Sequence, residues 1–133
     1  MTTPSDSAGR LRAYAFDAAG GRLGAMRILV ERGVLPGRPD GATVDAEGCV
    51  WNARYDGSCV ARITPQGRVD GIIEIPASRV TSCAFGGADL RTLFITTARQ
   101  KLTREELIAQ PLAGSLFAVR LDVGGLPEPR FGA

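Results

Sequence analysis

The sequence predicts an all-β fold, on three observations. Short apolar runs recur at intervals of roughly ten residues, a spacing typical of sandwiches, barrels and propellers. The 17 glycines and 8 prolines of the chain punctuate these runs and leave no long helical segment. The pattern also repeats at long range, because Trp51 matches Phe94 at a spacing of 43 residues and Tyr14 matches Val60 at 46. Periods of this length with four strands each are typical of propeller blades.

The apolar runs place ten strands along the chain. They are residues 11–16, 26–30, 42–44, 49–55, 59–63, 71–75, 80–85, 93–98, 116–121 and 128–131. The first two are expected to be the outer strands of one blade, and the following eight make two complete four-stranded blades. One short helical insertion is expected in the last blade, because Thr103 and Glu106 have capping-box spacing and Pro111 follows. A single domain is predicted over residues 10–133, after a disordered N-terminus at residues 1–9.

Charge and hydropathy exclude two classes of partner. The 16 basic and 14 acidic residues give a net charge of +2, and the basic residues are scattered along the chain. This pattern lacks the basic stripe of a nucleic-acid-binding or membrane-surface protein. No window approaches the ~18 apolar residues that span a bilayer, and no signal peptide is evident. A cytoplasmic protein is expected.

The titratable residues limit the chemistry. Three cysteines, Cys49, Cys59 and Cys83, lie in apolar runs without metal-type spacing, so they are expected to be buried and reduced. The chain has no histidine, which excludes a Ser-His-Asp triad, a Cys-His pair and a histidine metal ligand. Any metal site must therefore use oxygen ligands, which favour Ca²⁺, Mg²⁺ or Mn²⁺, although carboxylate zinc sites also occur.

One stretch carries a family resemblance. Residues 36–51 read PGRPDGATVDAEGCVW and contain the pattern P-D-G-x-x-x-D-x-E-G-x-x-W. This resembles the signature of the family that includes gluconolactonases, regucalcin (senescence marker protein) and luciferin-regenerating enzyme. Similarity continues through residues 55–60, 65–67, 81–87, 93–99, 114–119 and 125–127. Residues 10–133 thus resemble the C-terminal part of that family's β-propeller.

The resemblance implies a six-bladed ring with a divalent metal in its central channel, most simply Ca²⁺ or Zn²⁺, with Mg²⁺ or Mn²⁺ as alternatives. In the family the ligands are a Glu near the N-terminus, an Asn in a P-N-G motif and the Asp of P-D-G. Only the last is present here, as Asp40. That carboxylate is also the family's proposed general base, while the metal polarises the lactone carbonyl. Asp40 is therefore the expected catalytic and metal-binding residue.

Other polar residues have competing interpretations. Thr81 and Ser82 either line the channel in a second layer around the metal, or satisfy backbone groups with their hydroxyls. Asp45 is expected to be a turn residue, which Asn could replace with little effect on activity. Trp51 and Phe94 are expected to pack between blades. Asn52 faces away from Trp51, either into solvent or into a core.

Two functions follow as hypotheses. The first is a metal-dependent sugar lactonase that hydrolyses aldonolactones, inactive as this chain alone because two of the three family ligands are absent. It needs a complementary N-terminal half. The second is a non-catalytic fragment, a binding or self-assembly module that forms a homo-oligomer to cover an exposed blade face and edge strands.

Overall fold

The computed structural model describes residues 2–3 and 9–130. This part of the chain is almost entirely β-structure with one short helix, as predicted. The elements are β1 (Thr2–Thr3), β2 (Leu11–Asp17), β3 (Arg22–Val30), β4 (Arg38–Val44), β5 (Val50–Tyr55), β6 (Cys59–Ile63), β7 (Val69–Glu74), β8 (Val80–Gly86), β9 (Thr92–Thr97), α1 (Arg104–Ala109) and β10 (Leu116–Arg120). Every predicted strand but the last corresponds to one of them.

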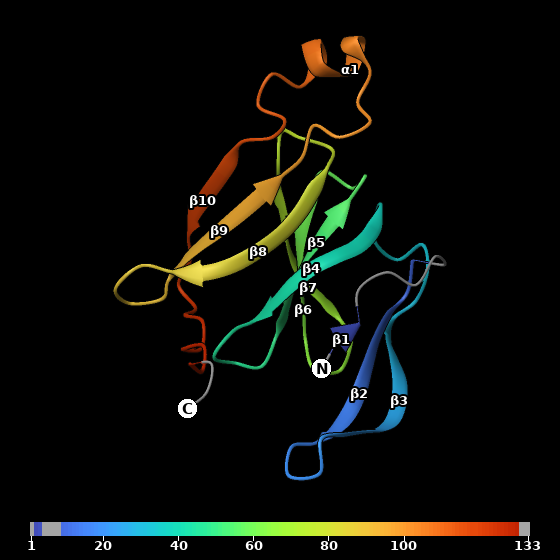
Figure 1. Ribbon diagram of the computed structural model, residues 1–133, viewed down its shortest axis with the longest axis vertical. Coiled ribbons are helices and arrows are strands. Elements are labelled where there is room, and N and C mark those ends of the chain that lie inside the picture. Colours follow the sequence, from blue (N-terminus) through green and yellow to red (C-terminus); the bar gives the residue numbers. More distant parts are fainter. Residues whose placement is uncertain (1, 4–8, 131–133) are drawn as a thin grey trace.

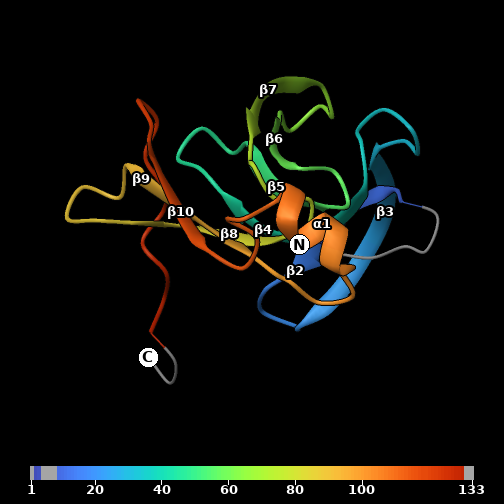
Figure 2. The same cartoon turned by 90° about the horizontal axis from the view of Figure 1, so that it is seen from above.

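The strands form three separate antiparallel sheets. Their orders are β1-β2-β3, β4-β5-β6-β7 and β10-β9-β8. The four-stranded sheet lies in the middle, and the other two extend from it on opposite sides (Figures 1 and 2). Together they form an open arrangement that does not close into a ring. The edge strand β4 of the central sheet lies beside the edge strand β8 of the last one.

The two terminal sheets differ from the predicted strand counts. The first sheet has a third strand, because Thr2 pairs with Ala13 and Thr3 with Arg12. Of the stretch predicted to be disordered, residue 1 and residues 4–8 lie outside the described residues. The last sheet has three strands and not four, because residues 128–130 form no strand. This stretch is exposed and includes Pro129, which has no N–H to donate to a ladder; Phe131 lies outside the described residues.

Alternation along β5 produces two cores, one on each side of the central sheet. Trp51 and Ala53 face the last sheet, where they pack with residues such as Val80 and Leu93. Val50 faces the first sheet, in a cluster with Leu11, Leu29, Val30, Leu35, Ala61 and Ile63. Burying an aliphatic side chain stabilises the fold by about 1.5–3 kcal/mol. These two clusters are what hold the three sheets together.

The aromatic residues Trp51 and Phe94 have different environments. Trp51 is buried and meets Phe85 of the neighbouring sheet edge-on, with ring centroids 6.3 Å apart. This confirms the predicted packing between sheets. Phe94 occupies the same place in the last sheet but is 37% exposed. It has no following sheet to pack against in the described part of the chain.

Helix α1 begins and ends where the sequence predicts. Thr103 is its N-cap, and the reciprocal bonds with Glu106 form a complete capping box. Gln110 follows the helix and its side-chain oxygen accepts a hydrogen bond of 2.6 Å from the backbone N–H of Ser78. The helix therefore lies at the end of the molecule where β9 ends and β8 begins (Figure 1). No helix in the described residues is long and apolar enough to cross a membrane.

The cysteines Cys49, Cys59 and Cys83 are all buried and free, as predicted. Burial raises the pKa of the Cys83 thiol to about 12. The thiol donates to the carbonyl oxygen of Trp51 at 3.3 Å. At neutral pH Cys83 is thus a protonated core residue that joins two sheets.

Candidate functional site

Asp40 lies in a β-bulge near the start of β4. Pro39 pairs with Arg54 and Ala42 with Asn52, so β4 contains one residue more than β5 between these pairs. A bulge bends its strand, changes the direction of a side chain and interrupts the ladder. Because β4 is an edge strand that lies beside β8, the Asp40–Gly41 bulge is at the edge of the central sheet nearest the last sheet.

The carboxylate of Asp40 is partly buried. Burial raises its pKa, while the backbone N–H of Gly41 and the guanidinium of Arg38 oppose this rise. No ion pair involves Asp40 within the described ranges. It is therefore a desolvated carboxylate without a cation in contact, a state that favours binding of a cation or a proton.

Asn52 resolves the alternative that the sequence left, because it is fully buried. Its Nδ2 donates to the carbonyl oxygen of Asp40 at 3.0 Å and to that of Gly41 at 3.4 Å. These two carbonyls belong to the bulge, where the regular ladder is interrupted. The side-chain amide of Asn52 thus donates hydrogen bonds to carbonyl oxygens at the point where the strand pairing is interrupted.

Arg54 lies two residues along the same strand and is 2% exposed. Its Nη1 donates to Oδ1 of Asn52 at 3.1 Å. Its Nε and Nη2 donate to the carbonyl oxygens of Pro36 and Gly37 at 2.9 and 3.0 Å. Burial lowers the pKa of Arg54. All its described acceptors are neutral, so its hydrogen bonds hold the loop before β4 without an ion pair.

A second bulge lies opposite the first. In β8, Val80 pairs with Thr97 and Ser82 with Thr96, which leaves Thr81 as the extra residue. The Oγ1 of Thr81 lies 2.8 Å from the Oγ1 of Thr96. This bond to a side chain differs from the backbone role considered for Thr81, and the second-layer role of Thr81 and Ser82 stays a prediction.

The two bulges meet closely at Gly41. A Cβ on this residue would lie 2.3–2.8 Å from Oγ, Cβ and Cα of Ser82. Only glycine therefore permits β4 and β8 to approach this closely. The contact brings the chain segments of Asp40 and of Ser82 together, two of the three predicted site residues.

An aromatic and charged cluster lies at the same end of β4. The guanidinium carbons of Arg38 and Arg79 lie 5.2 and 4.9 Å from the centroid of the Tyr55 ring. Asp56 accepts from Arg38 at 3.2 Å and also contacts Arg79. One carboxylate thus offsets two guanidinium groups, so the cluster has a net positive charge.

Asp45, five residues after Asp40, is a buried structural residue and more than the turn residue that the sequence predicted. Its carboxylate accepts from the backbone N–H groups of Glu47 and Cys49, each at 3.0 Å. It also accepts from Nε1 of Trp51 at 2.9 Å and from Nε of Arg62 at 2.8 Å. Burial lowers the pKa of Arg62, but hydrogen bonds to three carboxylates outweigh this and raise it.

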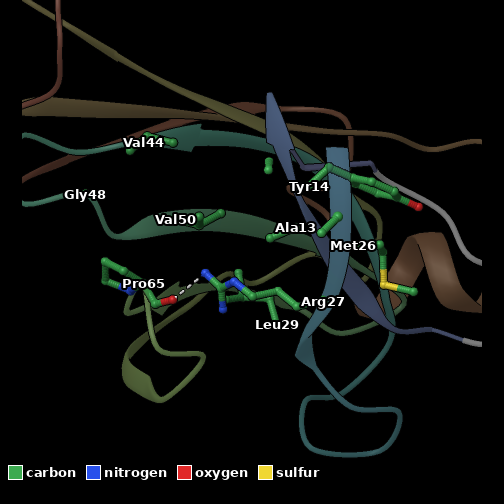
Figure 3. Close-up of a pocket in the computed structure, with 11 residues that line it drawn as sticks. Ala13, Tyr14, Met26, Arg27, Leu29, Val44, Gly48, Val50 and Pro65 are labelled. Carbon is green, nitrogen blue, oxygen red and sulfur yellow. Dashed lines mark hydrogen bonds between the residues drawn. The ribbon is translucent and has the colours of Figure 1, made fainter. Parts of the chain in front are cut away.

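A groove of about 610 Å³ separates the first and central sheets. Its lining is mostly apolar and includes Tyr14, Met26 and Val50. Figure 3 shows Arg27, which donates across the groove to the carbonyl oxygen of Pro65 at 2.6 Å. No carboxylate lines this groove, so it is separate from the Asp40 site and is a gap between sheets.

The described residues contain no group of three or more Asp, Glu or Cys side chains that could hold a metal ion. Asp40 supplies one carboxylate, and a divalent cation normally needs several converging oxygen ligands. The described part of this chain thus supplies no complete set of metal ligands. Sequence reasoning missed Asn52 and Arg54 as site residues. The sequence feature that could have identified them is a pair of polar residues at alternate positions of an otherwise apolar strand.

Known proteins similar to this chain are consistent with the expected family. This chain is 50% identical over 113 residues to 6-deoxy-6-sulfogluconolactonase of Pseudomonas putida, and the match covers 84% of this chain and 38% of that protein. It is 39% identical over 122 residues to pentonolactonase XacC of Haloferax volcanii, covering 89% of this chain and 41% of that protein. The chain thus spans about two fifths of the length of these relatives.

Solved structures agree. Regucalcin from Agrobacterium tumefaciens, described as a calcium-binding protein, superposes with a TM-score of 0.87 at 31% identity. The match covers 96% of this chain and 43% of that one. The family model for the SMP-30/gluconolactonase/LRE-like region matches residues 5–99, which include both bulges and the Asn52–Arg54 pair. This chain therefore belongs to the SMP-30/gluconolactonase/LRE-like family.

Proposed function

We propose that this chain is part of a metal-dependent sugar lactonase that hydrolyses aldonolactones, with Asp40 as its general base and one of its metal ligands. The observation that carries the proposal is the position of Asp40: a partly buried carboxylate, in a bulge, without a cation partner. Relatives named 6-deoxy-6-sulfogluconolactonase and pentonolactonase support the substrate class.

The chemistry assigned to Asp40 is proton transfer. In lactone hydrolysis a water molecule attacks the carbonyl carbon, and its proton must leave as the new C–O bond forms. The Asp40 carboxylate accepts this proton and returns it to the ring oxygen as the ester C–O bond breaks, which yields the hydroxy acid. A desolvated carboxylate with a raised pKa is a stronger base than one in water.

A complete site requires further propeller blades. Asp40 alone does not hold a divalent cation with open positions, because such a site needs at least two more converging ligands. The family resemblance implies a Glu and an Asn as those ligands, and they would come from segments that this chain does not contain. The six-bladed ring is accordingly part of the proposal, and this chain by itself is expected to be inactive.

The test is complementation. This chain is co-expressed with the N-terminal three fifths of the P. putida relative, and hydrolysis of D-glucono-1,5-lactone is measured with Ca²⁺, Zn²⁺, Mg²⁺ or Mn²⁺ and with a chelator. We expect metal-dependent hydrolysis from the complex and none from either part. A folded complex that binds the metal yet shows no hydrolysis of this or a pentonolactone would refute the proposal.

A binding or self-assembly module is the second candidate, favoured by the exposed apolar residues of the terminal sheets. Phe16, Leu23, Met26 and Ile28 on β2 and β3 are 41–54% exposed, and Leu116 on β10 is 63% exposed. Exposed apolar patches of this kind mark interaction surfaces. We propose the complementary blades of the lactonase as their occupant, because the relatives extend well beyond the matched part. A self-assembly module would instead place a second copy of this chain there.

Light scattering after size exclusion distinguishes the occupants. The proposed occupant predicts a one-to-one complex with the N-terminal segment of the relative, and loss of that complex when Met26 and Ile28 are replaced by Lys. A concentration-dependent homodimer that excludes the segment would identify a second copy as the occupant. A folded monomer that ignores the segment would contradict both.

A further inference from the structure

We propose that Asn52 and Arg54 are positioning residues: Asn52 fixes the backbone of the Asp40–Gly41 bulge, and Arg54 fixes Asn52, so that together they set the direction of the Asp40 carboxylate. The inference rests on the proposed function only for its kinetic consequence. Its structural content, that this pair determines the conformation of the bulge, stands on the contacts of this chain alone.

The first support is the arrangement of the bonds. Asn52 donates to both carbonyls of the bulge, and Arg54 spans from Asn52 to the carbonyls of Pro36 and Gly37. The chain is thus anchored on both sides of Asp40, before the strand at Pro36–Gly37 and within it at Asp40–Gly41. A residue between two anchored points has few backbone conformations left.

The second support is burial without charge compensation. Asn52 is 0% and Arg54 2% exposed, and the acceptors of Arg54 are oxygens of two carbonyls and one amide. A buried guanidinium without a carboxylate partner is costly, and apolar residues of similar volume commonly give equal or better stability at such positions. Stability alone thus does not explain why both residues are polar.

The third support is an internal comparison with the last sheet. The register pairs Ala42 with Asn52 in one bulged strand pair and Cys83 with Ile95 in the other, so Asn52 and Ile95 occupy equivalent positions. Ile95 is also fully buried, but it is apolar. The β8 bulge is instead contacted from the strand by Thr96, whose Oγ1 donates to Ser82 at 3.4 Å.

The equivalent of Arg54 in the same comparison is Thr97, which pairs with Val80 as Arg54 pairs with Pro39. Thr97 bonds to a loop at residues 114–115 and not to the chain before β8. A bulge therefore forms in this fold without a buried Asn and Arg beneath it. The Asn52–Arg54 pair occurs where the bulge carries a carboxylate, which indicates positioning of that carboxylate as its role.

The structural test uses the full chain and the amide NMR signals of Asp40, Gly41 and Ala42. Asn52→Leu removes both donors at nearly constant volume, and Asn52→Asp keeps the acceptor for Arg54 while removing the donors. We expect both variants to displace the three signals more than those of residues 59–63. The control Ile63→Val loosens the core on the same side of the sheet and should show the reverse pattern.

The kinetic test uses the complemented complex. Asn52→Leu and Asn52→Asp should lower kcat by about tenfold to a hundredfold, the usual effect of a displaced catalytic group, with KM changed far less. Ile63→Val should leave both constants unchanged. If Asn52→Leu fails to fold, Asn52→Asp serves as the test variant, because its carboxylate provides Arg54 with a charged acceptor.

The results separate the two proposals. Unchanged signals at Asp40 and Gly41 in a folded Asn52 variant would overturn the positioning role, whether or not the complex is active. Displaced signals with no loss of kcat in an active complex would also overturn it. Displaced signals together with a complex that never hydrolyses lactones would support the structural role and refute the proposed function.

Discussion

The two ends of strand β4 each carry a buried polar network, and the two networks differ in how they treat an aspartate. At the end of the strand, Asp45 is fully buried and accepts four hydrogen bonds, one of them from a guanidinium. Near the start, Asp40 is partly buried, and the network beneath it bonds to its backbone and not to its carboxylate. A carboxylate with four donors stabilises a fold, whereas a carboxylate without an ion-pair partner is available for chemistry.

The difference also appears in the cations. Arg62, beside Asp45, contacts the carboxylates of Asp45, Glu47 and Asp70. Arg54, beneath Asp40, contacts only neutral oxygens in the described structure. One network pairs its carboxylates with a guanidinium in contact, whereas no guanidinium of the described residues forms an ion pair with Asp40. Local sequence does not reveal this difference in hydrogen bonding, since each aspartate is followed by a small residue in a turn-like motif.

The largest expected effect is on stability at Asp45. Asp45→Ala leaves the buried indole N–H of Trp51 and the backbone N–H of Cys49 without their acceptor, and each buried donor left unsatisfied costs about 1–3 kcal/mol. Urea denaturation of the full chain should show this loss. Glu31→Ala, at the exposed ion pair with Arg10, is the control and should cost less than about 1 kcal/mol. Equal losses would mean that Asp45 is a surface-like turn residue after all.

The next effect concerns activity at Asp40. Asp40→Asn retains an oxygen and the volume but removes the negative charge and the proton acceptor. In the complemented complex the hydrolysis rate should fall by at least about 10²-fold, and metal affinity should weaken as well. Rate measurements and metal titration check this. If the substitution left the activity of the complex unchanged, Asp40 would be neither the general base nor a required metal ligand.

A smaller effect is expected at Gly41. In Gly41→Ala the new methyl group would collide with Ser82, and overpacking of this kind costs about 1–3 kcal/mol. The same change at Gly71 is the matched control, because a Cβ there meets only Arg62 Cβ at 4.0 Å. Thermal melting of the two variants should therefore differ. If both melted like the wild type, β4 and β8 would not be in close contact.

The smallest effect is a pH dependence at Asp40. Burial raises the pKa of this group above its ordinary value of 3.8, so the folded state binds its proton more tightly than the unfolded state does. Stability should fall as the pH rises from 3.8 through the raised pKa. Asp40→Asn, which cannot ionise, should therefore be more stable than the wild type at pH 7.

The comparison at pH 3 provides the control for this effect. Below the unfolded value both states of the wild type are protonated, so its difference in melting temperature from Asp40→Asn should shrink. A gap that grew toward low pH would show that the folded state favours the charged form of Asp40. That result would remove the contrast with Asp45, whose carboxylate is held by donors.

Much of the fold followed from patterns that are local in sequence. Short apolar runs bounded by turn residues placed nine of the strands, and the Thr103–Glu106 spacing located the capped helix. The predicted final strand, residues 128–131, was wrong over its described residues 128–130, where Pro129 has no N–H to donate to a strand ladder. The short strand β1 was missed because two polar residues such as Thr2 and Thr3 carry no periodic signal, and only pairing with β2 orders them.

The sequence by itself determined that the chain is all-β and that its Pro-Asp-Gly segment belongs to the gluconolactonase-type signature, since both depend on residue order within short windows. Tertiary structure decided which aspartate is satisfied and what Asn52 and Arg54 contact. These facts depend on bulges and on residues 11 to 18 positions apart, which strand pairing brings within hydrogen-bond distance. Hydrogen bonds depend on atomic distance and direction, and neither can be read from the spacing of letters along a chain.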